Sequence, residues 1–353
     1  MKFIQWFQSL KLDSNRLIHS LKTAIAFLIG IFIIRIFNFQ QGQWILISIL
    51  VVMCAQSRVG AIIQKSYMRF LGTVLGASIA ALTLWLAYPS FIWTTLILCL
   101  TTALFSYIAD SPGYLSEAGP LGAVTTVIIL VGLNPSYTNV LDRFFEISLG
   151  IIIALLVSRF IWPLHSRTQL RCIVTTTLQD LKQLSEQLKI FTSVAAEKTY
   201  QKYEDKVISR FANQTKLLDE VLRESFGRLK PVLVFKDILR GEREILLCIN
   251  LMKNALKNFS ETVRLTFNQQ VHVQKIYEIS DHLFLLLMEQ LNENKIKSSV
   301  ETLADLGWKE KMYGELNMLV TNTSDRLAID LFIFAAGNLI TQLRSMNFLI
   351  EKI

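Results

Sequence analysis

The sequence predicts an all-α polytopic membrane protein with six transmembrane helices followed by a cytoplasmic helical-bundle domain. The mean hydropathy is +0.41 and only 18% of the residues are charged, whereas soluble proteins typically carry about 25%. The charges are also distributed unevenly, since residues 1–163 contain 15 of them and residues 164–353 contain 49. We therefore assign residues 1–163 to a transmembrane domain and residues 164–353 to a water-soluble helical domain.

Six apolar segments are long enough, or nearly long enough, to cross a bilayer, which requires about 20 residues. They cover residues 17–37, 44–55, 70–87, 91–108, 115–131 and 144–162. Turn sequences such as those around Pro89, Pro112 and Pro135 separate them, because proline does not continue a helix well. The second and fifth segments are the least secure, and each could be short, tilted or partly re-entrant.

Basic residues in short loops predict the orientation, because Lys and Arg remain on the cytoplasmic side. The loops at 38–43 and 87–90 contain no basic residue. The basic residues around the first three segments are Lys2, Lys11 and Arg16 before the first, and Arg58, Lys65 and Arg69 between the second and third. We therefore expect both termini in the cytoplasm. A bias toward Lys, Ile, Asn and Phe indicates a bacterium, and hence the inner (plasma) membrane.

The C-terminal half shows helical periodicity and almost no Gly or Pro. The expected helices cover residues 169–191, 196–226, 233–264, 269–293, 297–320 and 325–349. The apolar stretch 327–340 could be a seventh crossing. Asp330 inside it and Arg344 soon after it favour a buried core or dimer helix, because a charge at bilayer depth costs about 2.5–3.5 kcal/mol. No internal repeat stands out in the sequence.

The usual signatures of enzymes and metal sites are absent from the sequence. The four histidines show no metal-ligand spacing, and there is no phosphate loop and no serine nucleophile elbow. The four cysteines are far apart and are read as small apolar side chains. We expect no enzymatic activity, no cofactor and no metal. Basic residues are not interleaved with aromatic ones in a block, so we also expect no nucleic-acid binding.

The third apolar segment carries a face of small residues that begins with a cation. At helical spacing, this face contains Arg69, Gly72, Thr73, Gly76 and Ala80. Small residues allow helices to pack closely. The pattern fits a packing face whose arginine extends to lipid headgroups, and it fits equally a packing face that also borders a solute path.

The sixth apolar segment carries a similar face. It contains Arg143, Glu146, Gly150, Ala154 and Ser158. Arg143 and Glu146 are one turn apart and can form an ion pair. The pair would either brace the helix or contribute to a solute path, in which Glu146 could also carry a proton.

Basic residues are expected at both ends of the transmembrane domain. They are Arg35 and Arg143 on the outer side, and Lys22, Lys65 and Arg69 on the inner side. Lys and Arg around a pore select anions by attraction and by replacing hydration. An anion path is therefore the physical hypothesis, although membrane topology alone would produce much of this pattern.

Two runs of the sequence resemble a known family. The run from Trp44 through Gly60 and Lys65 to Arg69-x-x-Gly72-Thr73-x-x-Gly76 resembles the first signature of the fusaric-acid-resistance and aromatic-acid-exporter superfamily. The run from Arg143-x-x-Glu146-x-x-x-Gly150 to Trp162-Pro163 resembles its second signature. The plan of six helices and a cytoplasmic helical domain is also similar to that of the plant aluminium-activated malate transporters. The resemblance covers about residues 17–163.

This resemblance implies passive or proton-coupled movement of organic, often aromatic, carboxylates, frequently outward and by a dimer. Some relatives fuse two such units, so we expect a homodimer here, and some work beside a periplasmic adaptor protein. The resemblance implies that the path is lined by Lys65, Arg69, Thr73, Arg143 and Glu146, to which the charge pattern adds Arg35. Gly72, Gly76 and Gly150 are expected to serve helix packing. The alternatives are an anion channel of the malate-transporter type and a membrane-anchored helical scaffold or sensor.

Overall fold

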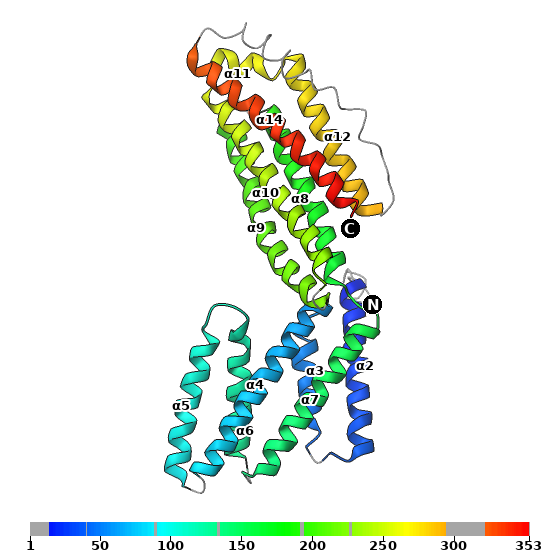
Figure 1. Ribbon diagram of the computed structural model, residues 1–353, viewed down its shortest axis with the longest axis vertical. Coiled ribbons are helices and arrows are strands. Elements are labelled where there is room, and N and C mark those ends of the chain that lie inside the picture. Colours follow the sequence, from blue (N-terminus) through cyan, green and yellow to red (C-terminus); the bar gives the residue numbers. More distant parts are fainter. Residues whose placement is uncertain are drawn as a thin grey trace, which may run out of the picture. The chain divides into compact units, whose positions relative to one another are not determined.

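A computed structural model describes residues 14–39, 41–87, 90–132, 135–190, 194–225, 228–293 and 322–352. These residues are helical or lie in turns, and no strand occurs among them. The chain divides into two compact units, Met1–Ser166 and Arg167–Ile353 (Figure 1). We call them the membrane unit and the C-terminal unit.

The membrane unit is built from helices that run alternately in opposite directions (Figure 1). They are α2 (Ser14–Phe37), α3 (Gln43–Met53), α4 (Val59–Leu86), α5 (Phe91–Ala109), the short 3-10 helix η1 (Tyr114–Glu117), α6 (Ala118–Val131) and α7 (Tyr137–Phe160). The predicted class, an all-α polytopic membrane protein, is confirmed.

The helices of the membrane unit differ in their ability to cross a bilayer. By length and apolarity, α2, α4, α5 and the segment Tyr114–Val131 qualify as spans. Helix α7 has 24 residues but includes the charged pair Arg143 and Glu146. Helix α3 has 11 residues and measures only about 16 Å at 1.5 Å per residue, against a hydrocarbon thickness of about 30 Å. The six expected segments correspond to α2 through α7, with α3 as the short member.

Helix α4 begins earlier than the sequence analysis predicted. The expected segment began at residue 70, with Lys65 and Arg69 in the preceding connection, whereas the helix begins at Val59. Gln64 and Lys65 lower the hydropathy of these turns without interrupting the helix. This expectation was wrong, and the correction moves Arg69 about 15 Å along the helix from its first residue.

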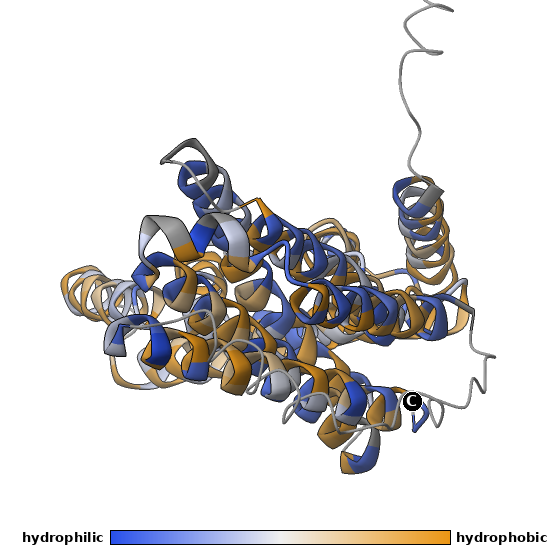
Figure 2. Cartoon of the chain, turned by 90° about the horizontal axis from the view of Figure 1, so that it is seen from above, coloured by the Kyte–Doolittle hydropathy of each residue, from blue (hydrophilic) through white to orange (hydrophobic). Residues whose placement is uncertain are grey.

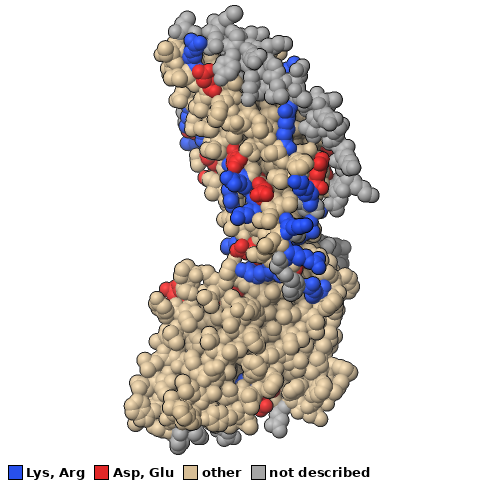
Figure 3. All heavy atoms as spheres, in the orientation of Figure 1, with Lys and Arg blue, Asp and Glu red and all other residues tan. Residues whose placement is uncertain are grey.

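Helices α4 and α7 lie at the centre of the membrane unit. They pack on each other, α6 packs on α4 and α3 packs on α7, while α5 and α2 pack on α6 and α3 respectively. One apolar core joins α3 to α7 through residues such as Ile49 and Ile151, and another joins α4 to α6 through Ala80 and Ile129. The outer face of the unit shown in Figure 3 is almost free of charged side chains, as a surface in contact with lipid requires.

The C-terminal unit is a bundle of amphipathic helices, on which hydrophilic and hydrophobic residues alternate (Figure 2). They are α8 (Ser166–Lys189), α9 (Val194–Glu224), α10 (Leu229–Asn258), α11 (Glu261–Phe267), α12 (Val271–Glu293) and α14 (Thr323–Ile350). The helix expected over 233–264 is divided after Asn258, where the Asp325 carboxylate accepts hydrogen bonds from the backbone N–H and the Oγ of Ser260. The helix expected over 297–320 lies outside the described residues.

Helix α14 is apolar and long enough to qualify as a span by composition. Its apolar side chains nevertheless lie in the core of the C-terminal unit, where Phe332, Leu339 and Leu343 are fully buried. It packs on α10 and α12. Helix α14 is therefore a core helix, the alternative favoured over a seventh crossing.

Candidate functional site

Arg69 is a buried cation without a counter-charge on the described part of the chain. The residue is 3% exposed and lies in the third turn of α4. Its Nε has no hydrogen-bond partner, and no ion pair or hydrogen bond to its guanidinium is found among the described residues. Since a guanidinium stays protonated in proteins, an unpaired one in the interior carries a large desolvation cost. Such a group is a candidate for binding an anion.

The small residues that follow Arg69 hold α6 close to α4. A Cβ added at Gly72 would lie 2.7 Å from the carbonyl oxygen of Ala118, and one at Gly76 would lie 2.5 Å from that of Gly122. Thr73 is fully buried on the same helix and donates to the Arg69 carbonyl oxygen at 2.8 Å. The face identified in the sequence is therefore a close helix contact with a buried cation at its start.

Arg143, in contrast, has a counter-charge and two further neighbours that stabilise a cation, although its Nη1 makes no hydrogen bond. Its Nη1 lies 3.6 Å from Oε2 of Glu146, whose exposed fraction is 3%. Its Nη2 donates to the side-chain oxygen of Gln41, and its guanidinium lies 4.2 Å from the ring centroid of Trp44. A carboxylate, an amide and an aromatic face together stabilise this cation.

Three further basic residues of the predicted path occupy different environments. Lys65 forms an ion pair of 3.3 Å with Glu117, and both side chains are partly exposed. Lys22 is fully buried and donates to the Ser158 carbonyl oxygen at 3.2 Å. Arg35 is exposed near the end of α2, and within the described residues no hydrogen bond or ion pair joins it to Arg143. Among the described residues, the structure therefore shows no site shared by Arg35 and Arg143, the two basic residues expected on the outer side.

Two residues of this region were missed by the sequence analysis, Gln41 and Glu117. Gln41 lies just before the short helix α3, and Glu117 lies at the N-cap of α6. The available signal was their position, because the polar residues that precede short apolar helices lie at membrane depth when the helix does not cross the whole bilayer. Their partners are distant in sequence, so residue spacing could not reveal them.

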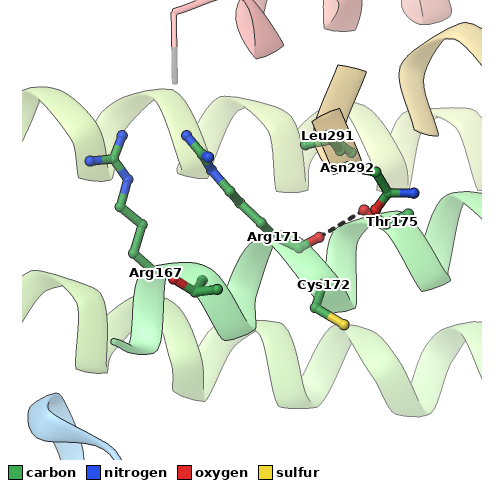
Figure 4. A pocket seen from close by; sticks show the side chains of 7 residues that line it. Arg167, Arg171, Cys172, Thr175, Leu291 and Asn292 are labelled. Carbon is green, nitrogen blue, oxygen red and sulfur yellow. Dashed lines mark hydrogen bonds between the residues drawn. The ribbon is translucent and has the colours of Figure 1, made fainter. Parts of the chain in front are cut away.

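The C-terminal unit contains a separate basic pocket of about 460 Å³ (Figure 4). Arg167 and Arg171 extend from α8 on one side, and Leu291 and Asn292 of α12 lie on another. Burial, together with the positive charge of Arg167, lowers the pKa of Arg171. Both arginines have interactions within the chain. No cluster of metal-ligating side chains occurs among the described residues of either unit.

Comparisons with known proteins found two matches, of which the first lies in the membrane unit. Residues 27–157 match the family model described as fusaric acid resistance protein-like. A curated relative, inner membrane protein YeeA of Escherichia coli (strain K12), is 28% identical over 178 residues. That match covers 50% of this chain and 48% of the relative, so the chain spans about half the length of the curated relative that it matches.

The family match includes both arginines and all three packing glycines, since it extends from within α2 to the last turn of α7. The relative is an inner membrane protein, and this chain is a multi-pass membrane protein by its helices. Over residues 27–157, the chain is therefore similar to the fusaric acid resistance protein-like family.

Proposed function

We propose that the protein is an inner-membrane transporter that exports organic carboxylates, with Arg69 as the residue that binds the carboxylate. The single observation that carries this proposal is the buried guanidinium of Arg69 in a membrane-spanning helix, for which the described residues provide no hydrogen bond and no ion pair. Ionisable residues within membrane segments are costly and usually mark substrate or ion pathways.

The chemistry of Arg69 favours a carboxylate as its ligand. A planar guanidinium forms two parallel hydrogen bonds with a carboxylate, and these charge-assisted bonds are stronger than neutral ones. The environment is water-poor, so the attraction is stronger than at a surface. An organic anion with a carboxylate and an apolar body would satisfy Arg69 and tolerate the apolar surroundings.

The family name supports the direction of transport. Members are described by resistance to fusaric acid, and a membrane protein provides resistance most simply by moving an acid outward. An aromatic body is our proposed preference for the substrate. Coupling to protons is a second part of the proposal, because Glu146 is a buried carboxylate in the same unit.

The test is carboxylate flux through purified protein in liposomes, with and without an imposed pH gradient. We expect flux of aromatic carboxylates that the gradient increases. Arg69→Gln should reduce this flux by a factor of about 30 or more, since removing one partner of a buried charge contact costs about 2–5 kcal/mol.

The matched control is Arg159→Gln, which removes an exposed cation from the last turn of α7. This variant should retain most of the flux. Wild-type flux from folded Arg69→Gln protein would contradict the proposal. Flux of small anions that ignores the pH gradient would instead indicate an anion channel, and no flux of any carboxylate would favour a membrane-anchored scaffold or sensor.

We also propose that the transporter is a homodimer, and that a periplasmic adaptor protein is a further partner, as the resemblance implies. Many large apolar side chains of α5, including Phe91, Ile92 and Trp93, are exposed on the single chain. A second copy or lipid would cover them. The mass of the purified particle, measured together with the flux, tests both statements.

A further inference from the structure

The contacts of α4 with α6 are repeated by α7 with α3. A Cβ added at Gly76 would lie 2.5 Å from the carbonyl oxygen of Gly122 and 3.0 Å from Cβ of Thr125, three residues later. A Cβ added at Gly150 would lie 2.5 Å from the carbonyl oxygen of Ile45 and 2.7 Å from Cβ of Ser48, again three residues later. In each case a glycine on the long helix contacts a carbonyl and a hydroxyl residue on the short one.

The sequences of the two long helices agree with this correspondence. Residues 69–82 read RFLGTVLGASIAAL and residues 143–156 read RFFEISLGIIIALL, with seven identities in 14 positions. Arg69 corresponds to Arg143. The corresponding residues Phe70 and Phe144 contact each other, with ring centroids 5.9 Å apart. Contact between corresponding residues is expected where a two-fold axis passes between two repeats.

The two long helices run in opposite directions. The backbone N–H of Val59, at the start of α4, donates to the carbonyl oxygen of Leu164, just after the end of α7, at 3.2 Å (Figure 1). The outer helices follow the same scheme, since α2 packs on α3 as α5 packs on α6. We infer that α2–α4 and α5–α7 are two inverted halves of one unit. Inverted repeats with short helices in corresponding positions are typical of transporters.

The correspondence also identifies what Arg69 lacks. Matching the contacts of Gly76 and Gly150 relates each residue of α3 to one of α6 that lies 77 positions later. The three partners of Arg143 therefore have counterparts around Arg69: Gly72 for Glu146, Ala118 for Gln41 and Leu121 for Trp44. The packing agrees, because Ala118 and Leu121 both lie against Gly72.

None of these counterparts has a charged, polar or aromatic side chain. The chain supplies a carboxylate, an amide and an aromatic ring around Arg143, whereas the corresponding positions around Arg69 supply none of the three. We propose that the carboxylate of the transported anion pairs with Arg69 as Glu146 pairs with Arg143. This proposal rests on the proposed function and specifies its site. Since the counterparts on α4 and α6 supply no partner for Arg69, a single external carboxylate can bind there.

The test is to place a carboxylate on the chain where the transported anion would bind. Leu121 is half-buried on α6 and corresponds to Trp44, which lies over Arg143. Leu121→Glu should pair with Arg69 and weaken the apparent affinity for benzoate at least tenfold, roughly the effect of losing one charge contact. Leu121→Gln is the matched control, with the same size and no charge, and should change the affinity less than about threefold.

Two readouts separate this proposal from the proposed function. The first is benzoate flux in liposomes. The second is the melting temperature of the full chain in detergent, with and without benzoate, for wild type, Arg69→Gln, Leu121→Glu, Leu121→Gln and the double variant Arg69→Gln/Leu121→Glu. We expect benzoate to stabilise the wild type and Leu121→Gln but not Leu121→Glu, and we expect the two substitutions to be strongly non-additive.

Each outcome decides one statement. If wild type transports benzoate and Leu121→Glu does so equally well, the site assignment is wrong while the transporter proposal stands. If no carboxylate is transported, the transporter proposal fails, and non-additive melting temperatures with loss of benzoate stabilisation would still support pairing at Arg69. Additive melting temperatures, or equal benzoate stabilisation of both Leu121 variants, would overturn it.

Discussion

Helices α4 and α7 share a sequence pattern that begins with an arginine, but the side chains around the two arginines differ. On α7, Arg143 lies 3.6 Å from a carboxylate and contacts an amide and an aromatic ring. On α4, Arg69 is 3% exposed and its Nε has no partner. The comparison supports our proposal that Arg143, with its counter-charge on the chain, serves the structure, whereas Arg69, without one among the described residues, binds a ligand.

The largest expected effect is on the α7 side of the comparison. Glu146→Gln removes the counter-charge of Arg143 and should destabilise the membrane unit by about 3–5 kcal/mol, because a buried cation is left uncompensated. Thermal unfolding of the full chain in detergent measures the loss. Asp142→Asn, an exposed change on the same helix, should have little effect. If Glu146→Gln melts like the wild type and only loses the response to a pH gradient, Glu146 acts in proton coupling, the second part of the proposed function, and does not brace Arg143.

The glycine contacts should be equally costly to change in the two halves. Gly76→Ala and Gly150→Ala each place a Cβ 2.5 Å from a backbone carbonyl oxygen, so each should lower stability by about 1–3 kcal/mol. Ser78→Ala, at an exposed position of α4, is the control. Melting temperatures of the three variants test the inverted repeat, which a cost confined to one of the two glycines would weaken.

The smallest expected effect concerns a buried carboxylate in the C-terminal unit, which can be compared with the buried charges of the membrane unit. Glu242 is fully buried and accepts a hydrogen bond of 2.6 Å from Gln214. Burial raises the pKa of Glu242 well above its ordinary value, although Gln214 and nearby arginines oppose the shift. Because the folded state holds the proton more tightly than the unfolded state, the stability of this unit should fall as pH rises above the ordinary pKa of about 4.5.

Glu242→Gln removes this pH dependence. We expect the variant to exceed the wild type in stability by about 1 kcal/mol or more at pH 8 and to equal it near pH 4. Calorimetry of the full chain at the two pH values measures the difference. Glu244→Gln, at an exposed position of the same helix, is the control. A wild-type chain that is more stable at pH 8 than its Glu242→Gln variant would show that a buried carboxylate is compensated here without a paired arginine.

The sequence was sufficient to predict the fold class and most helices, because hydropathy and proline positions depend on local composition. The prediction failed where a few residues differ in polarity from the rest of their helix, or where a distant side chain ends a helix. Because Gln64 and Lys65 are polar, the hydropathy did not reveal the start of α4. The periodicity predicted a helix that continued through Ser260, where hydrogen bonds to the Asp325 carboxylate accompany the end of the helix.

The candidate site was predicted only in part. The spacing of Arg143 and Glu146 suggested an ion pair, because both belong to one helix. Gln41 lies 102 positions before Arg143 in the sequence, so no local pattern could connect the two. The repeat was missed although α4 and α7 share seven of 14 residues, because α3 and α6 correspond by their contacts and not by their residues.

The most direct test of the central claim is the melting temperature of Arg69→Gln, measured in detergent on the protein whose flux is lost in liposomes. An unpaired buried guanidinium costs stability, so its replacement by a neutral side chain should raise the melting temperature while carboxylate flux disappears. A melting temperature that falls as far as that of Glu146→Gln would show that Arg69 has a structural partner, and would contradict the assignment of Arg69 to an external anion.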